Sequence, residues 1–586
     1  MKKKLLAALL AGCMCAGLLA GCGNGEGAPV SGQGGSESSK AAEKSSVSQE
    51  DTAGAEQEPD VSTHLNISAW VHTDDNEDGY FSDFNENPVL DYLSEKFNVT
   101  FEWQIPPTGS ESEQMNLMIG SGDYTDVFDS TFSQQSCQEL YEDGVIQDLT
   151  PYVEKYMPNY MALIESSETL QKSAYTDEGR IIYIPNLPNE ASLSWGGMIY
   201  NRKILEDMTD GKIQFPSGKE EPYSVEDWEY MLDLMKQYYD ASGLTDYACL
   251  ILPATGYFQA GDILTGFGTT GNYYVDESGK VQFGVLTKEF YNYLVKMNEW
   301  YEKGYIYQDF ASRSDDPFYF PNTALTYSGS AGIFYGLVSQ LYGAMSVPEY
   351  GIEMDYRALT APVDTANNST PLPANGMVNS NESVDVFTGG WVVSSACKEE
   401  ELIRWLQICD YLFSEEGSMM KSYGLTKEQA GDNAIYAKLG MQDGAYWFDD
   451  KGEFVYNPVS DPFSVEATVK KENQLRIARL PGLTNWTYYN QKSDEGVQEA
   501  HKVWTSNGYS ACIPVGVTLT VDENKTYSPL YTACNDYISS MVPKFIMGTE
   551  PLTEESFHSF EQQIISLGMD KCLELYQTAY DRYMAK

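Results

Sequence analysis

Strand and helix patterns alternate over residues 65–128, and this alternation limits the fold more than any other feature of the sequence. Apolar and polar positions alternate in the strand segments, and Asn87 followed by Pro88 is typical of a helix start. The expected elements, in order, are strand 65–71, a helix from Pro88, strand 99–103, helix 111–120 and strand 126–128. Because strands separated by helices pair in parallel, we predict an α/β fold with a parallel sheet.

The carboxyl ends of these strands are where a ligand is expected, since open parallel sheets bind ligands beyond that edge. The residues at the ends of the first and third strands are Trp70, His72, Asp74, Asp75, Asp129 and Ser130. A sugar packs its apolar face on an aromatic ring while its hydroxyls bind polar neighbours, and the chain is rich in rings, with 43 Tyr, 23 Phe and 10 Trp. We therefore take these residues as candidate ligand contacts.

Most of the later sequence predicts helices. With 586 residues the chain is too long for one compact core, so two or more lobes are expected. Apolar stripes at helical spacing occur over 290–301, 402–413 and 573–583, and such stripes indicate helices that face a core. Residues 276–280 and 449–453 are typical of hairpin turns.

The N-terminus is typical of a secreted lipoprotein. Lysines at 2–4 precede an apolar run that ends in Leu-Ala-Gly-Cys at 19–22, which resembles the bacterial lipobox. In that motif the cysteine is diacylated, so Cys22 is the expected lipidation site. Residues 23–63 contain no Phe, Tyr, Trp, Leu or Ile and are expected to form a flexible tether with a reach of about 35 Å. We expect this anchor alone to hold the protein at the extracellular face of the cell membrane.

The charge balance excludes partners that need a basic surface. The chain has 86 Asp and Glu against 37 Lys and Arg, a net charge of −49. Nucleic acid and anionic lipid both select clustered basic residues. Neither is therefore an expected partner.

Cysteine and acidic patterns give little support for a metal or disulfide site. The seven Cys after the N-terminal segment are widely spaced without a CxxC pair, so neither a disulfide framework nor a zinc site is expected, and a Cys512–Cys534 bridge stays open. Residues 74–79 fit the first six positions of a calcium loop, but its twelfth position is Asn85 rather than Glu. We expect no cofactor, with calcium as the open alternative.

A series of short motifs resembles the extracellular solute-binding proteins of ABC importers, the maltose-binding-protein-like group, and in particular its long Gram-positive lipoproteins. The motifs are GSGDYTDVF at 120–128, LYEDGVIQDL at 140–149, GRIIYIP at 179–185, MIYNR at 198–202, the segment 324–334, GWVV at 390–393 and YLFSEEG at 411–417. Their order along the chain carries the resemblance over nearly all of residues 63–586.

This resemblance implies a type II periplasmic-binding-protein-like fold, in which crossing hinge strands join two α/β lobes. By position it adds the candidate ligand contacts Trp195, Phe334, Tyr335 and Trp391. The implied division is signal peptide 1–21, linker 22–62, lobe 1 at 63–185, lobe 2 at 186–390, a return to lobe 1 at 391–445, and lobe 2 with a C-terminal helical extension at 446–586.

The implied function is capture of a carbohydrate, with an oligosaccharide favoured, between the lobes for an ABC importer whose permease subunits are the protein partners. A peptide or other solute is the alternative within the superfamily. A secreted glycan-active enzyme is the alternative from another class, because two carboxylates suffice for glycoside hydrolysis. No catalytic residues stand out, since the four His lack metal-ligand spacing and residues 328–332 fail the GxSxG pattern. We expect a non-catalytic monomer.

Overall fold

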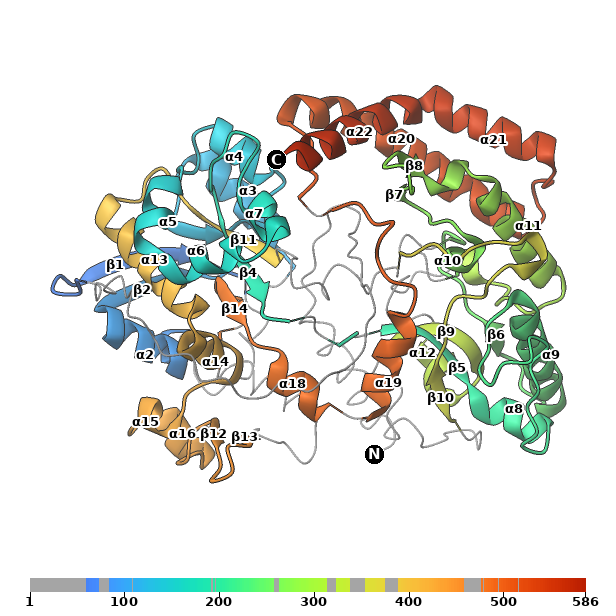
Figure 1. Cartoon of the computed structure of the whole chain (residues 1–586), viewed down its shortest axis with the longest axis horizontal. Coiled ribbons are helices and arrows are strands. Elements are labelled where there is room, and N and C mark those ends of the chain that lie inside the picture. Colours follow the sequence, from blue (N-terminus) through green and yellow to red (C-terminus); the bar gives the residue numbers. More distant parts are fainter. Residues whose placement is uncertain are drawn as a thin grey trace, which may run out of the picture. The chain divides into compact units, whose positions relative to one another are not determined.

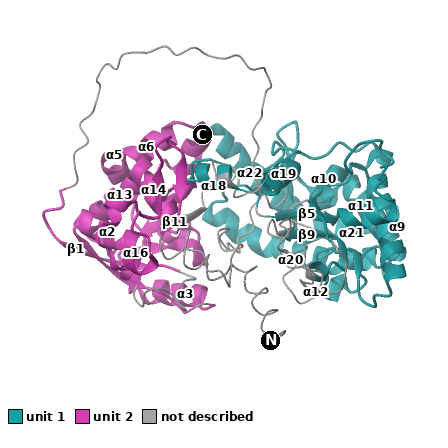
Figure 2. Cartoon of the chain, turned by 90° about the horizontal axis from the view of Figure 1, so that it is seen from below, with its two compact units in different colours: residues 1–31, 188–386, 485–586 teal, residues 32–187, 387–484 magenta. Residues whose placement is uncertain are grey.

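The chain forms two compact units, which Figure 2 shows in different colours. The computed structural model describes residues 60–72, 84–107, 109–190, 193–194, 196–257, 263–312, 323–337, 354–374, 388–457, 476–477, 479–493, 495–514 and 516–586. Of these, unit 2 holds the residues up to Leu187 and those between Phe387 and Thr484, and unit 1 holds the rest. The prediction of a two-lobed α/β chain is confirmed, with unit 2 as lobe 1 and unit 1 as lobe 2.

Unit 2 is built on a six-stranded sheet (Figure 1). Its strands are β1 (Leu65–Trp70), β2 (Val99–Gln104), β3 (Val127–Asp129), β4 (Ile184–Pro188), β11 (Thr388–Val393) and β14 (Gly482–Thr484). Their order across the sheet is β14-β4-β11-β3-β1-β2. β1 pairs in parallel with β2 and β3, which confirms the predicted parallel sheet, whereas β11 runs antiparallel to β3 and β4.

Helices cover this sheet, and those that begin at Pro88 and Glu111 start where the sequence predicts. They are α2 (Pro88–Phe97), α3 (Glu111–Ser121), α4 (Cys137–Glu142), α5 (Thr150–Tyr156), α6 (Pro158–Glu165), α7 (Glu168–Ala174), α13 (Glu399–Phe413), α14 (Glu415–Tyr423), α15 (Lys427–Ala430) and α16 (Ala434–Leu439). The Asn87 side chain caps α2 by accepting from the N–H groups of Val89 and Leu90. The apolar stripe over 402–413 lies on α13, and its residues are buried in the core of the unit.

The strands that carry the chain between the units are neighbours in this sheet. The chain passes from one unit to the other between residues 187 and 188, between 386 and 387, and between 484 and 485, and we call these points the unit changes. They lie at the ends of β4, β11 and β14. The sequence predicts these unit changes at 185/186, 390/391 and 445/446. The third prediction is wrong, because the chain leaves unit 2 at 484/485. Residues up to Thr484 stay in unit 2 because β14 pairs at the edge of its sheet, beside β4.

Unit 1 has a four-stranded sheet and a layer of long helices. The sheet strands are β5 (Gly196–Asn201), β6 (Ala248–Leu250), β9 (Ala331–Leu337) and β10 (Tyr356–Ala358), in the order β10-β5-β9-β6. The helices are α8 (Arg202–Met208), α9 (Val225–Ser242), α10 (Leu264–Phe267), α11 (Lys288–Glu302), α12 (Thr323–Ser328), α18 (Thr487–Lys492), α19 (Glu495–Trp504), α20 (Val521–Ile546), α21 (Glu554–Leu567) and α22 (Met569–Ala585). The predicted apolar stripes over 290–301 and 573–583 lie on α11 and α22.

Both predicted hairpin turns are confirmed. Residues 276–280 join β7 (Tyr273–Val275) to β8 (Val281–Phe283) in unit 1. Residues 449–453 join β12 (Tyr446–Phe448) to β13 (Phe454–Tyr456) in unit 2. In both turns the first Asp accepts hydrogen bonds from backbone N–H groups two and four residues later, which explains the choice of Asp there.

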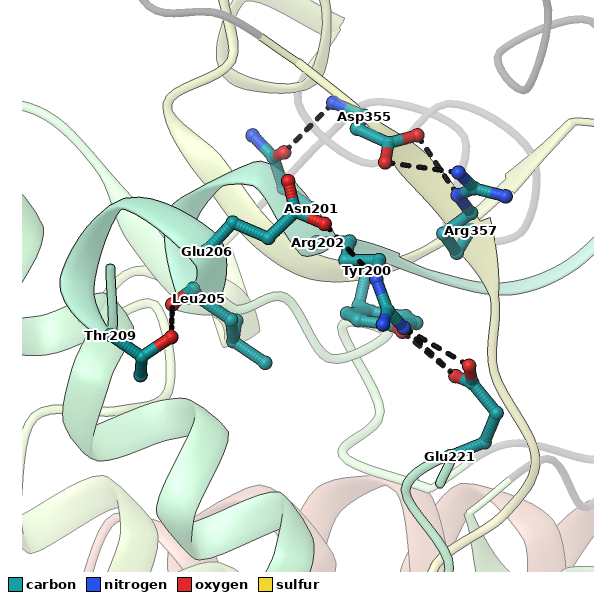
Figure 3. Close-up of polar contacts among 9 residues, drawn as sticks. All are labelled: Tyr200, Asn201, Arg202, Leu205, Glu206, Thr209, Glu221, Asp355 and Arg357. Atoms are coloured by element: carbon teal, nitrogen blue, oxygen red, sulfur yellow. Dashed lines mark hydrogen bonds and ion pairs between the residues drawn. The ribbon is translucent and has the colours of Figure 1, made fainter. Parts of the chain in front are cut away.

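A polar cluster fixes the end of β5 in unit 1 (Figure 3). The Arg202 guanidinium donates to Glu221 at 3.0 Å and to the Tyr200 hydroxyl at 3.1 Å. The backbone N–H of Asp355 donates to Asn201 at 3.1 Å, and so β10 is held against β5 beyond their backbone pairing. These contacts join β5 to β10 and to the segment that carries Glu221, so we assign the cluster a structural role.

A buried arginine fixes the start of the folded part in unit 2. Arg404 on α13 is 4% exposed, and its guanidinium donates to the carbonyl oxygen of Asp60 at 2.8 Å and to that of Phe97 at the end of α2. It also lies 3.4 Å from the carbonyl oxygen of Thr63. A cation there suits the unpaired carbonyls of a helix C-terminus. We call this arrangement the Arg404 clamp.

Candidate functional site

The carboxyl ends of β1 and β3 bring four of the predicted residues together in unit 2. The ring of Phe132, in the short turn after β3, lies 4.9 Å from the His72 ring and 6.3 Å from the Trp70 ring. His72 also lies 3.2 Å from the Glu111 carboxylate on α3. Trp70 and His72 are buried, whereas Phe132 is half-buried. The ring that reaches the surface at this edge is therefore Phe132, with Trp70 and His72 packed behind it.

Asp129 and Ser130 continue this edge with polar groups. The buried Asp129 carboxylate accepts from the backbone N–H of Thr131 at 3.1 Å, and burial raises its pKa above the ordinary range despite that bond. The Ser130 hydroxyl donates to the carbonyl oxygen of Gly390 at 2.7 Å. A Cβ on Gly390 would lie 3.2 Å from the Ser130 oxygen and 3.4 Å from the Tyr183 ring. β3 and β11 thus meet closely where Ser130, Thr131 and Tyr183 remain half-buried.

Trp391 lies in the core rather than at this surface. The backbone of Trp391 on β11 lies opposite Asp129 on β3, but the Trp391 side chain is only 1% exposed. The indole ring centre lies 5.2 Å from that of Trp405 on α13, and its N–H donates to the carbonyl oxygen of Arg479 at 2.9 Å. An aromatic ring closed off on all sides offers no face to a sugar, so we no longer include Trp391 among the candidate contacts.

The other predicted residues lie elsewhere. Phe334 and Tyr335 are on β9 in unit 1, where both side chains are buried and the Phe334 ring packs edge-on against Tyr356. Asp74, Asp75 and Trp195 lie outside the described residues, as does the calcium-like segment 74–79. The structure therefore gathers Trp70, His72, Asp129 and Ser130 in unit 2 and places Phe334 and Tyr335 in two hydrophobic clusters of unit 1.

A second polar and aromatic set, which sequence reasoning missed, lies in unit 1 directly after two of the unit changes. The Asn189 side chain donates to Thr487 at 2.9 Å and accepts from the backbone N–H of Trp486 at 2.8 Å. Asn490 on α18 donates to the Glu190 carboxylate at 3.0 Å. These contacts hold the first residues after 187/188 and after 484/485 side by side.

α18 carries accessible aromatic rings beside these polar groups. Trp486 is half-buried, Tyr489 is 52% exposed, and their ring centres lie 5.5 Å apart, edge to face. The run Asn-Trp-Thr-Tyr-Tyr-Asn at 485–490 is a signal for such a surface, because it places three aromatic rings between two hydrogen-bonding amides. The predicted division has no unit change at 484/485, so it does not indicate a site at this run.

A serine–histidine contact supports the same part of unit 1. His501 on α19 accepts at Nδ1 from the backbone N–H of Ser194 at 3.1 Å, and the Ser194 hydroxyl lies 2.9 Å from the same atom. Because a backbone N–H points at Nδ1, we assign the neutral ring with its proton on Nε2. Burial lowers the pKa of His501, which favours that neutral form. The contact fastens residues 193–194 to α19.

Metal and covalent features are sparse in the described part of the chain. Those residues contain no group of three or more His, Cys, Asp or Glu suited to a metal ion. Cys512 and Cys534 are separate buried thiols, so the bridge that the sequence left open is not formed. Burial raises the pKa of the Cys137 thiol beside Ser130 to about 11, which keeps it protonated at neutral pH.

None of the helices described combines the length and apolarity that a membrane crossing requires.

Comparisons with known proteins give fold likeness without sequence likeness. No protein-family model and no curated protein matches the chain. An HMO-binding solute-binding protein of Bifidobacterium longum infantis superposes with a TM-score of 0.67 at 16% identity, over 89% of this chain and 99% of that chain. Streptococcus pneumoniae FusA, an ABC-transporter substrate-binding protein solved as an EF-hand mutant with fructo-nystose, gives 0.64 at 16% over the same shares. The alginate-binding protein AlgQ2, solved without calcium ion, gives 0.62 at 16%, again over 89% and 99%.

Proposed function

We propose that this chain, whose fold is that of ABC-transporter extracellular solute-binding proteins, captures an oligosaccharide for import. Each unit offers a set of candidate ligand contacts in this proposal. In unit 2, Ser130, Phe132 and Tyr183 are half-buried contacts, and the buried Asp129, His72 and Glu111 support them. The unit 1 set is Asn189, Glu190, Trp486, Tyr489 and Asn490. In hinge-bending binders a ligand favours one arrangement of the hinged parts.

The observation that carries the proposal is the pairing of accessible rings with hydrogen-bonding side chains beside the strands where the chain changes unit. Tyr489 and Trp486 offer ring faces next to Asn490 and Glu190, and Phe132 lies next to the Asp129–Ser130 edge. Aromatic rings suit the apolar faces of sugars, and amide and carboxylate groups suit their hydroxyls. The HMO-binding solute-binding protein and the fructo-nystose complex of FusA, which share this fold, add support.

The arrangement of these residues supports the alternative functions less well than oligosaccharide binding. A glycosidase needs an acid and a second carboxylate facing one bond. Glu111 lies against His72, and Asp129 is held by Thr131, so both carboxylates are already engaged. We therefore propose a binder rather than an enzyme. A peptide ligand is the second candidate, since Trp486 and Tyr489 would also accept apolar side chains.

A binding screen tests the proposal. Neutral oligosaccharides, short peptides and calcium are added in turn to the purified chain, and thermal unfolding is followed. A ligand at 100 times its Kd should add about 2.7 kcal/mol of stability, which is readily seen as a shift in Tm. Stabilisation by a glycan supports the proposal, whereas stabilisation by peptides alone would replace the sugar by a peptide. Turnover of a glycan would overturn the non-enzyme part.

A matched pair of variants locates the site. Tyr489→Ala removes a ring that is 52% exposed on α18, and Phe448→Ala removes one that is 49% exposed on the β12–β13 hairpin. Loss of a contact ring should cost about 2 kcal/mol, or roughly thirtyfold in Kd, at Tyr489 only. Equal effects of the two variants would remove α18 from the proposed surface.

We also propose the location and partners that the N-terminal sequence implies. Cys22 would carry the lipid, residues 23–59 would act as the tether, and the binder would work at the extracellular face of the membrane. The permease subunits of an ABC importer would then receive the ligand.

A further inference from the structure

A buried lysine lies against the ends of two strands that lead out of unit 2. Lys421 on α14 is 0% exposed. Its ammonium donates to the Asn186 side-chain oxygen on β4 at 2.8 Å and to the Thr484 hydroxyl oxygen on β14 at 2.7 Å. The Thr484 hydroxyl in turn donates to Asn186 at 2.9 Å. We call these three residues the Lys421 triangle.

The triangle stands directly before two unit changes. Asn186 precedes the change at 187/188 by one residue, and Thr484 is the last residue before the change at 484/485. On the unit 1 side, the Asn189 side chain bonds Thr487 and the backbone of Trp486. The two connecting segments are therefore tied to each other both before and after they leave unit 2.

The charge of Lys421 is costly where it lies. Burial lowers the pKa of the lysine to about 7, and Arg476, a like charge in the segment before β14, adds to that effect. The ammonium bonds one side chain on each of two strands, Asn186 on β4 and Thr484 on β14, so its contacts point to control of the two segments.

We propose that Lys421 is a positioning residue for ligand capture, which couples the connecting segments at Asn186 and Thr484 so that they bend together. This inference rests on the proposed function. If the segments moved separately, the ligand-free chain would visit more arrangements, and a smaller fraction of molecules would be competent to close. The apparent Kd rises as that fraction falls.

Isosteric changes at Thr484 give the sharpest test. Thr484→Val removes the hydroxyl at nearly constant volume, whereas Thr484→Ser keeps it. Lys421→Met removes the ammonium, and Lys427→Met is the matched surface control, since Lys427 on α15 is 67% exposed and pairs with Asp443. The first readout on the full chain is the Kd of the glycan that binds best in the screen. The second is energy transfer, measured without ligand, between two dyes attached at the exposed positions of Glu102 and Glu554.

Thr484→Val and Lys421→Met should broaden the distribution of energy transfer and weaken glycan binding at least about fivefold, the lower end of typical coupling between sites. Thr484→Ser and Lys427→Met should match the original chain in both readouts. Unchanged distributions in Thr484→Val would overturn the inference even if Lys421→Met failed to fold. If no glycan binds the original chain, the proposed function fails, while the energy-transfer readout still decides the coupling.

Discussion

Replacing Lys421 with methionine is expected to change how the stability of unit 2 depends on pH. In the folded chain burial and Arg476 lower the lysine pKa to about 7, against 10.5 for the free side chain. Between these two values the unfolded chain holds a proton that the folded chain has lost. Stability therefore rises with pH across this window, and below about pH 7 both states are protonated and the slope disappears.

The magnitude follows from that displacement. Each pH unit well inside the window contributes about 1.4 kcal/mol, and the folded lysine is half titrated at pH 7, so from pH 7 to pH 9 the original chain should gain about 2 kcal/mol that the methionine variant does not. At pH 7 or below, the variant should be the more stable of the two, because it has no buried ammonium. The buried tyrosines titrate above this range and are common to both chains.

Unfolding by urea at pH 7, 8 and 9, followed by the tryptophan fluorescence of the chain, to which Trp391 and Trp405 of unit 2 contribute, measures the difference between the two chains. Taking the difference removes every group that they share. Lys427→Met serves as the control and should change stability by no more than about 1 kcal/mol, as exposed ion pairs do. If the original chain and Lys421→Met run parallel from pH 7 to pH 9, Lys421 is charged throughout and the reasoning about its burial is wrong.

Three further predictions concern other parts of the chain. Gly197→Ala would place a Cβ 2.4 Å from the Trp504 ring, so α19 must shift, and unit 1 should lose about 1–3 kcal/mol in thermal unfolding. Arg404→Met leaves the carbonyl groups of the clamp unbonded, so amide exchange at residues 60–63 should accelerate while glycan affinity stays unchanged. Cys22→Ala should release the protein from the membrane fraction into the medium, and continued membrane retention would contradict the lipid anchor.

Local signals in the sequence predicted the parts of the fold that local physics decides. The Asn87 cap, the turns at 276–280 and 449–453, and the apolar faces of α11, α13 and α22 all depend on residues within a few positions of each other. The order of motifs predicted the solute-binding-protein fold, and the structural likeness confirms it.

Long-range pairing decided what the sequence did not predict. β14 spans only Gly482–Thr484, too short to stand out as a strand, yet its place beside β4 keeps residues 446–484 in unit 2. Trp391 shows why the candidate site could not be predicted fully from the sequence. An aromatic residue at the end of a strand suits either a core or a ligand, and only the position of Trp405 on α13 decides for the core.

The Arg404 clamp has a mechanical consequence for a tethered protein. If the chain is anchored through Cys22 as proposed, a pull on the N-terminal side would enter the described part at residues 60–63, where Arg404 bonds the carbonyl oxygens of Asp60 and Phe97. Part of the load would then pass to α13 and to the end of α2. Without the clamp the same force would act along β1, a strand inside the sheet whose far end leads to Trp70 and His72. The arginine would therefore reduce the force that reaches the candidate site.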